Sequence, residues 1–150
     1  MADPASKRVL LTGGSSGVGF EAAKVLSAQG HELTIVCRNQ VTADQTRSLL
    51  PGSVHTLICD LADLGAIATI CSQLVDSGAA LDALVLNAGL QYAGASEAQF
   101  SVQGIELTFA VNQLAHQQMA MRLLPLLHQA NSPRVVITAS EVHNPSSGAG

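Results

Sequence analysis

Short apolar runs rich in β-branched residues alternate along this chain with longer stretches of helical periodicity. The apolar runs predict five strands. They are Arg8–Leu11, Leu33–Cys37, Val54–Cys59, Ala83–Leu86 and Val135–Thr138. The helical patterns lie between them, at Gly17–Gln29, Thr42–Leu50, Leu64–Val75 and about Ser101–Leu127. Because strands that alternate with helices form parallel βαβ units, the pattern predicts an α/β fold with a doubly wound parallel sheet.

Composition narrows the class of protein. The 150 residues suit one domain, and an apolar content of 47% with 12% charged residues excludes a disordered chain. A net charge of −4 argues against a nucleic-acid-binding face. We expect no membrane span, no signal peptide and no metal site, because no segment has the required pattern. Three cysteines without CxxC spacing indicate free, buried thiols and a cytoplasmic location.

A glycine-rich segment, Thr-Gly-Gly-Ser-Ser-Gly-Val-Gly, joins the first predicted strand to the first helix. Glycine lets the backbone approach a ligand closely, and the free N–H groups of a helix start suit a pyrophosphate. The spacing is GxxxGxG, whereas the broad dinucleotide pattern is GxGxxG. The candidate nucleotide-binding residues here are Thr12, Gly13, Ser15, Ser16, Gly17, Val18 and Gly19.

Two other known loop motifs share part of this glycine pattern. Gly13–Gly17 satisfies GxSxG, the turn that carries the nucleophile of serine hydrolases. A serine hydrolase of this kind needs an oxyanion loop from earlier strands, and only one predicted strand precedes Ser15. A P-loop is a poor fit because no Lys-Ser or Lys-Thr follows the last glycine. The nucleotide interpretation is therefore favoured.

The ends of the second and third strands carry the next candidate residues. A dinucleotide site usually places an acid at the end of the second strand, but this chain has Arg38-Asn39 there. A guanidinium can pair with a 2′-phosphate, so Arg38 is expected to select NADP over NAD. The third strand ends in Asp60-Leu61, where the carboxylate either accepts from the adenine amino group or caps the following helix.

Together these segments resemble the short-chain dehydrogenase/reductase family, whose TGxxxGxG loop matches Thr12–Gly19 at each fixed position. The family's Asn-Ala-Gly motif looks like Asn87-Ala88-Gly89, and its helix asparagine and catalytic serine look like Asn112 and Ser140. Cys37-Arg38-Asn39 and Ser140-Glu-Val-His143 are similar to the retinol dehydrogenase and protochlorophyllide reductase branches.

The resemblance implies a Rossmann-type sheet that spans residues 1–150 and binds NADP(H), with NAD(H) less favoured. It implies hydride exchange between the nicotinamide and a small carbonyl or alcohol substrate. In the family, Asn87-Ala88-Gly89 steadies the sheet beside the cofactor, and the helix asparagine or its carbonyl helps hold a water of a proton relay. Ser140 would hydrogen-bond the substrate oxygen.

Helical periodicity supports a structural constraint on Asn112 independently of that resemblance. At 100° per residue, one helix face carries Ile105, Phe109, Asn112, His116, Met119 and Leu123. An asparagine on such an apolar face is costly unless its amide is fully hydrogen-bonded. On the same face, His116 is expected to be a packed core histidine rather than a catalyst.

The family's proton donor is a tyrosine followed four residues later by a lysine, both after the serine. In these 150 residues the single tyrosine, Tyr92, precedes Ser140, and the lysines are Lys7 and Lys24. We therefore expect a sheet that is incomplete at its C-terminal side, with an open fifth strand that favours self-association into a homo-oligomer. The alternatives are a non-catalytic NADP-binding module or sensor and an enzyme similar to protochlorophyllide reductase.

Overall fold

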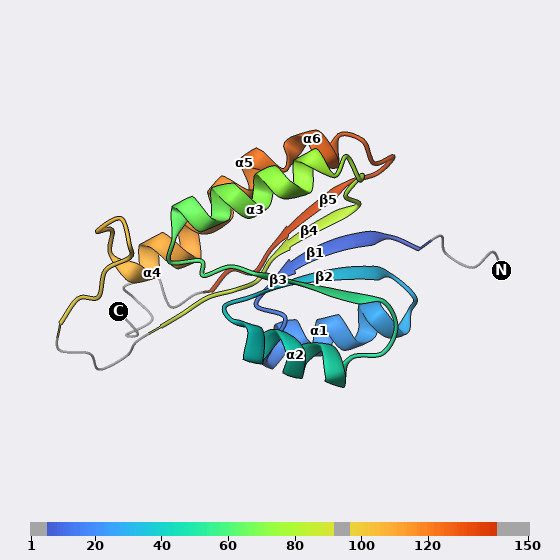
Figure 1. The fold of residues 1–150 in the computed structure, drawn as a ribbon, viewed down its shortest axis with the longest axis horizontal. Helices are drawn as coiled ribbons and strands as arrows, with labels where there is room; N and C mark the ends of the chain where they lie inside the picture. The colour runs from blue at the N-terminus through green and yellow to red at the C-terminus, as the bar shows by residue number, and fades with distance from the viewer. Residues whose placement is uncertain (1–5, 92–96, 141–150) are drawn as a thin grey trace.

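The computed structural model describes residues 6–91 and 97–140 (Figure 1). The strands are β1 (Arg8–Thr12), β2 (Glu32–Cys37), β3 (Val54–Ile58), β4 (Ala83–Leu86) and β5 (Arg134–Ile137). They form one parallel sheet in the order β3-β2-β1-β4-β5. The first three helices are α1 (Gly17–Ala28), α2 (Gln40–Leu49) and α3 (Leu64–Asp76). The predicted strand and helix order is confirmed, with ends that differ by one or two residues in this part of the chain.

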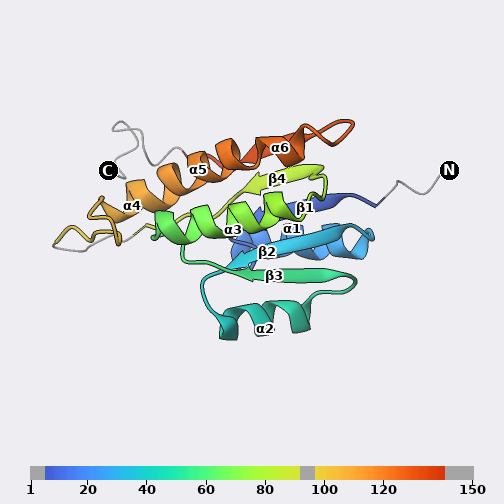
Figure 2. The same cartoon turned by 45° about the horizontal axis from the view of Figure 1, so that its top comes forward.

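Helices cover both faces of the sheet, so the doubly wound prediction is also confirmed (Figures 1 and 2). The alternation of side chains along β1 divides the core into two clusters. Val9 and Leu11 pack with buried residues of α1 and α2. Leu10 points to the other face, where α3 supplies Ile67 and the C-terminal helices supply Met119.

The long helix predicted from Ser101 is shorter and interrupted. It consists of α4 (Leu107–Phe109), a π-helical turn η1 (Ala110–Leu114), α5 (Ala115–Arg122) and α6 (Leu124–Leu127). It begins six residues late because Gly104 has a φ of +72°, which makes a turn in which the Ser101 N–H donates to the Ile105 carbonyl. The Glu106 carboxylate then accepts from the Thr108 and Phe109 N–H groups and caps the first turn.

The same interruptions change which residues share the buried face. His116, Met119 and Leu123 are buried as predicted, but Ile105 lies before the helix, Phe109 is 52% exposed and Asn112 is also exposed. A π-helical turn adds a residue per hydrogen-bonded ring and so rotates the residues before it out of the expected register. Pro125, which has no N–H to donate, accompanies the break at Leu123.

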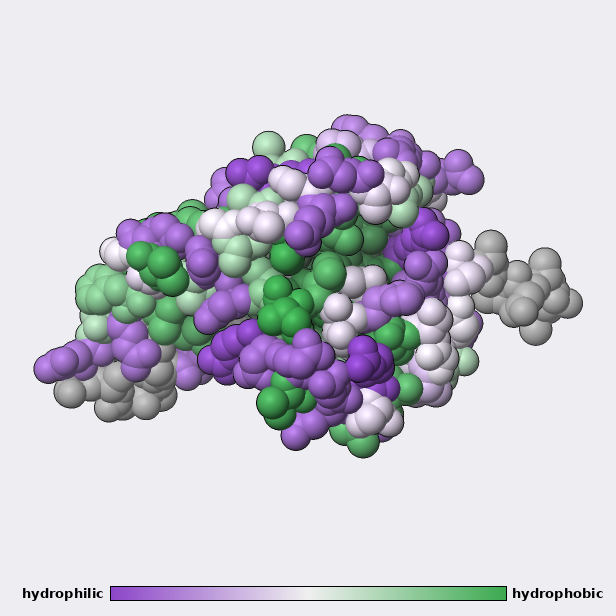
Figure 3. All heavy atoms as spheres, in the orientation of Figure 1, coloured by the Kyte–Doolittle hydropathy of each residue, from purple (hydrophilic) through white to green (hydrophobic). Residues whose placement is uncertain are grey.

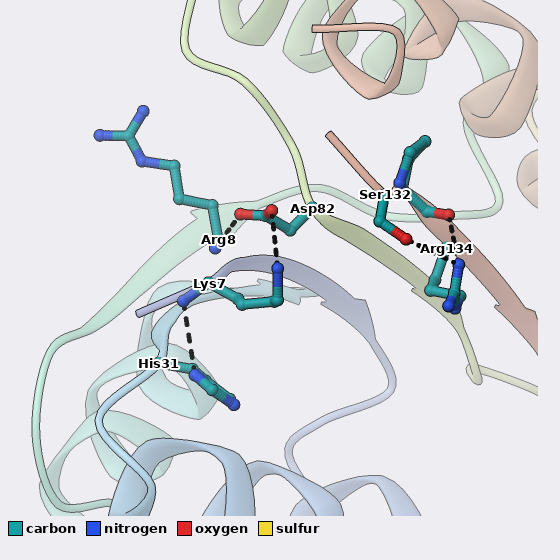
Figure 4. Close-up of polar contacts among 7 residues, drawn as sticks. Lys7, Arg8, His31, Asp82, Ser132 and Arg134 are labelled. Carbon is teal, nitrogen blue, oxygen red and sulfur yellow. Dashed lines mark hydrogen bonds and ion pairs between the residues drawn. The ribbon is translucent and has the colours of Figure 1, made fainter. Parts of the chain in front are cut away.

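Asp82 ties together the start of three strands, and Figure 4 shows its carboxylate bonded to Lys7 and Arg8. Asp82 accepts from the Arg8 N–H at 2.9 Å and from the Lys7 ammonium at 3.3 Å, while its own carbonyl accepts from the Arg134 N–H. These bonds join β1, β4 and β5 at the amino edge of the sheet.

The outer strand β5 is exposed along its whole length in the described structure. Ile137, its last residue, is 66% exposed, and its neighbours Val135 and Val136 are about half exposed. Such an open apolar edge agrees with the prediction that the sheet is incomplete on this side.

A buried polar cluster joins the C-terminal helices to the carboxyl end of β1. The Thr12 hydroxyl is fully buried and accepts from the backbone N–H groups of Asn87 and Ala88, both at 3.0 Å. His116 in α5 is 6% exposed, and its Nε2 lies 3.0 Å from the same oxygen. His116 is therefore a satisfied core histidine, as predicted.

Burial lowers the pKa of His116 from its ordinary value of 6.5, and a hydrogen bond to the Asn112 backbone opposes the shift. The unfolded chain takes up this proton near pH 6.5, whereas the folded chain does so only at lower pH. The contribution of neutral His116 to the free energy of unfolding is therefore complete above pH 6.5. It is lost as the pH falls towards the pKa of the folded chain, at no more than about 1.4 kcal/mol per pH unit. Denaturant unfolding from about pH 5 to about pH 8, where histidine titrates, measures how the free energy of unfolding changes with pH.

The variant His116→Gln is the control for that measurement. The remaining histidines of the described structure are not buried, so the variant should lose the part of the slope due to residue 116. Identical pH profiles for the two proteins would contradict the assignment.

Candidate functional site

The larger cavity of the described structure is a cleft of about 550 Å³ at the carboxyl ends of the strands. This edge is where open α/β sheets bind their ligands. Eleven of the sequence-predicted residues line it: Gly13, Ser15, Ser16, Val18, Gly19, Arg38, Asp60, Leu61, Asn87, Ala88 and Gly89. Thr12, Gly17, Asn39, Asn112 and Ser140 do not line it.

The three glycines of the predicted loop differ in what surrounds them. A Cβ on Gly19 would collide with the Gly13 carbonyl, and one on Gly13 would lie 2.7 Å from the Ala88 Cα. These two glycines therefore allow the loop to pack against itself and against the segment after β4. Gly17 has a φ of +55° and open space where its Cβ would be, so its backbone is accessible to a ligand.

The N-terminus of α1 has its backbone donors available. Its N-cap, Ser16, makes no side-chain capping bond, and no acidic residue lies in the first turn. By contrast, Asn39 caps α2 and Asp63 caps α3. An uncapped twelve-residue helix beside a glycine loop offers N–H groups and a positive dipole end to an anion.

Arg38 and Asn39 follow β2 but have different surroundings. Arg38 lines the cleft and makes no ion pair within the described residues. The Asn39 side chain accepts from the Thr42 N–H at 2.9 Å and so caps α2 outside the cleft. The Arg38 side chain can therefore meet an anionic ligand, whereas the Asn39 oxygen is already used.

The loop after β3 is held by its own carboxylates. Asp60 lines the cleft and accepts from the Ala62 N–H at 2.9 Å, while Asp63 is the cap of α3. Of the two roles expected for Asp60, capping the helix is wrong, because a residue three positions later does it. The Gln103 side chain and the Gly65 N–H donate to Asp63 and hold its pKa below the usual range.

Cys59 also lines the cleft, and the sequence argument did not place it there. Burial raises the pKa of its thiol to about 11, with neighbouring Cys71, Asp60 and Asp63 adding to the shift. The thiol is therefore protonated at neutral pH and is not a nucleophile. All three cysteines are buried and free, as predicted.

The Asn87-Ala88-Gly89 segment connects the glycine loop to β5. The Asn87 amide donates to the Gly13 carbonyl at 3.2 Å, and its oxygen accepts from the Thr138 hydroxyl at 2.9 Å. One side chain thus joins the ends of β1, β4 and β5 at the floor of the cleft. Thr138 is a lining residue that sequence reasoning missed, although its position after β5 offered a signal.

Asn112 lies in the π-helical turn, and its side chain is fully hydrogen-bonded. Its oxygen accepts from the Leu90 N–H at 2.8 Å, and its amide donates to the Leu90 carbonyl at 2.9 Å. Asn112 is exposed, so the prediction of an asparagine on a buried apolar face is wrong, and these bonds instead join the π-helical turn to the segment after β4. Gly89, which lines the cleft, lies close enough that a Cβ added to it would be 3.7 Å from the Asn112 side-chain oxygen.

Ser140 lies three residues beyond β5 and is exposed. His143 and Tyr92 fall outside the described residues. The remaining lining residues missed by the sequence argument are mostly apolar, and an apolar residue at a strand end or helix face carries no distinctive signal. They are Val36, Ala62, Leu90, Leu107 and Val111.

The second cavity of the described structure has a different position and character. It measures about 270 Å³ and lies between α3 and the amino-terminal halves of β1 to β3, with Leu10, Thr34 and His55 in its wall. Figure 3 shows apolar surface in the hollow between the helices and the strands. No glycine loop or uncapped helix N-terminus meets it, so the cleft at the carboxyl edge is the candidate site.

Metal-binding clusters and membrane-spanning helices are both absent from the described residues. No group of three or more His, Cys, Asp or Glu side chains there could hold a metal ion. No helix in that part of the chain is both long and apolar enough to span a bilayer.

Comparison with known proteins identifies relatives over nearly the whole chain. A protochlorophyllide reductase of Chlamydomonas reinhardtii is 35% identical over 147 residues, which are 94% of this chain and 37% of that protein. A short-chain dehydrogenase from Sphingobium yanoikuyae, solved in complex with NADPH, is 29% identical with a TM-score of 0.77. The match covers 95% of this chain and 57% of that structure.

A second solved structure, the Pseudomonas aeruginosa RhlG/NADP active-site complex, is 26% identical with a TM-score of 0.71. It aligns with 98% of this chain and 64% of its own. The chain thus spans between about a third and two thirds of the length of these relatives. The sequence profile described as short chain dehydrogenase matches residues 7–148. The chain therefore belongs to the short-chain dehydrogenase family.

Proposed function

We propose that residues 1–150 form the cofactor-binding domain of an NADP-dependent oxidoreductase acting on a carbonyl or alcohol substrate. The observation that carries the proposal is the cleft at the carboxyl edge of the sheet, which is lined by Gly13 and Gly19 of the glycine loop, by the uncapped start of α1 and by Arg38. Membership of an oxidoreductase family supports the reaction class.

The residues of the cleft fit a dinucleotide phosphate. The loop around Gly17 and the first N–H groups of α1 would hold the pyrophosphate, with the Ser15 and Ser16 hydroxyls as further donors. Asp60 and Leu61 would lie beside the adenine, and the Arg38 guanidinium would pair with the 2′-phosphate. A bound nicotinamide supplies hydride exchange.

Two residues would contribute to the reacting end of the site. The Ser140 hydroxyl would hydrogen-bond the substrate oxygen and stabilise the charge that develops on it. Asn112 would act through its backbone, because both ends of its side chain are bonded to Leu90.

The preference for NADP tests the role of Arg38. Wild-type protein should bind NADPH about tenfold or more tightly than NADH, because a charge-assisted bond to the 2′-phosphate is worth about 1.5–3 kcal/mol. Arg38→Asp should reverse the preference, since a carboxylate repels the phosphate and accepts from the ribose hydroxyl. Nucleotide fluorescence titration measures both affinities.

A matched neutral pair controls for loss of charge. Arg38→Gln removes the proposed contact, while Arg47→Gln removes a guanidinium that pairs with Asp44 at 2.7 Å on α2. Only the first should weaken NADPH binding. Equal affinity of the wild type for the two nucleotides, or none for either, would overturn the assignment of Arg38.

A second pair of variants tests the phosphate loop. Gly17→Ala adds a methyl group at the ligand-facing backbone and should weaken both NADPH and NADH by about tenfold, or 1.4 kcal/mol. Gly30→Ala is the matched control, because Gly30 also has a positive φ, of +82°, and open space at its Cβ, but lies at the amino end of β2.

Both alanine variants should lose about 1–2 kcal/mol of unfolding free energy from the left-handed backbone. The two effects are separated by measuring unfolding and nucleotide affinity on the same preparations. If both variants bind nucleotide equally well, the loop is not the pyrophosphate site.

A further inference from the structure

The buried Thr12 hydroxyl meets two backbone N–H donors and one histidine ring nitrogen. The Thr12 hydroxyl oxygen has two lone pairs, and both are used by the Asn87 and Ala88 N–H groups. The oxygen can therefore accept no further bond, and the His116 Nε2 atom at 3.0 Å cannot carry a hydrogen directed at it. The hydroxyl must instead donate.

Two acceptors lie within reach of the Thr12 hydroxyl hydrogen. The Val85 carbonyl oxygen is 3.5 Å from the Thr12 hydroxyl oxygen. An O–H···O bond usually measures about 2.5–3.0 Å, so this contact is long. The His116 Nε2 atom is 3.0 Å away. The shorter contact makes Nε2 the acceptor, so this nitrogen is unprotonated.

The other ring nitrogen must then carry the hydrogen. The Asn112 backbone, four residues earlier and within the π-helical turn, opposes the lowering of the His116 pKa by burial, as an acceptor for a ring N–H does. A backbone carbonyl only accepts, so the ring donates to it through Nδ1. Each donor and acceptor in this series of hydrogen bonds thus has one defined role, from the Asn112 carbonyl through the His116 ring to the Thr12 hydroxyl.

We propose that His116, held as the neutral Nδ1–H tautomer, is a positioning residue that fixes the Asn112 backbone against the start of the glycine loop. The inference rests on the proposed function for its consequence, because Thr12 precedes the loop and Asn112 lies beside the reacting end of the cleft. The low exposure of the ring and its lowered pKa agree with the neutral form.

The arrangement also assigns different tasks to the two parts of Asn112. Its side chain holds Leu90, next to the Asn87-Ala88-Gly89 segment, while its backbone carbonyl is oriented by His116. The same segment is held from the other side by the Thr12 hydroxyl. His116 therefore closes a ring of contacts around the floor of the cleft.

The tautomer is tested directly by long-range ¹H–¹⁵N correlation NMR on the ¹⁵N-labelled chain at neutral pH. The expected result is a His116 ring with a protonated Nδ1 and an unprotonated Nε2. A ring protonated at Nε2, alone or together with Nδ1, would overturn the proposal. This experiment needs no nucleotide, so its outcome is separate from that of the proposed function.

The positioning role is tested by amide hydrogen exchange in three variants. His116→Phe keeps a ring of similar shape without either nitrogen and should speed exchange of the Asn87 and Ala88 N–H groups about tenfold, as expected for the loss of one hydrogen bond. His116→Gln, which retains an acceptor at about the reach of Nε2, should restore part of the protection. Met119→Val shortens a fully buried apolar side chain of the same helix. Compared with His116→Phe at an equal loss of unfolding free energy, it should leave the exchange rates of these two amides unchanged.

Nucleotide affinity completes the test. NADPH should bind His116→Phe about tenfold more weakly than the wild type, and Met119→Val should bind like the wild type. If exchange and affinity change equally in His116→Phe and Met119→Val, His116 has only a packing role and the proposal fails. If the wild type binds no dinucleotide, the proposed function fails while the exchange result still decides the positioning role.

Discussion

The Thr12 hydroxyl is the contact on which the rest of this structure depends. It is fully buried at the carboxyl end of the central strand, where a polar group without partners would cost several kcal/mol, on the order of 1–3 per unmade bond. Its partners come from the segment after β4 and from α5. One side chain therefore determines how the glycine loop, the Asn87 segment and the C-terminal helices meet, and their meeting point is the floor of the cleft.

The cleft follows from that convergence together with two kinds of glycine. Gly13 and Gly19 bring backbone segments closer than any side chain would allow. Gly17 leaves its backbone open, at a helix end whose N–H groups have no capping side chain. Under the proposed function, backbone geometry would form the site for a phosphorylated ligand, and side chains such as Arg38 and Asp60 would distinguish one nucleotide from another.

Much of this arrangement could be predicted from the sequence because its signals are local. Buried parallel strands appear as apolar runs, and the glycine loop carries its spacing regardless of context. The helix after residue 100 could not be predicted as well, because a turn at Gly104, a carboxylate cap at Glu106 and a π-helical turn override simple periodicity. His116 was recognised as a core residue, but its link to Thr12 joins positions 104 residues apart, and no local pattern encodes such a contact.

The central claim is that the cleft at the carboxyl edge of the sheet binds a dinucleotide phosphate. Backbone chemical-shift mapping during an NADPH titration tests its location most directly. The account predicts that the shifts concentrate in the glycine loop, at Arg38, in the Asp60 loop and at the Asn87 segment. Shifts centred instead on the cavity beside Leu10, Thr34 and His55, or no shifts at all, would contradict it.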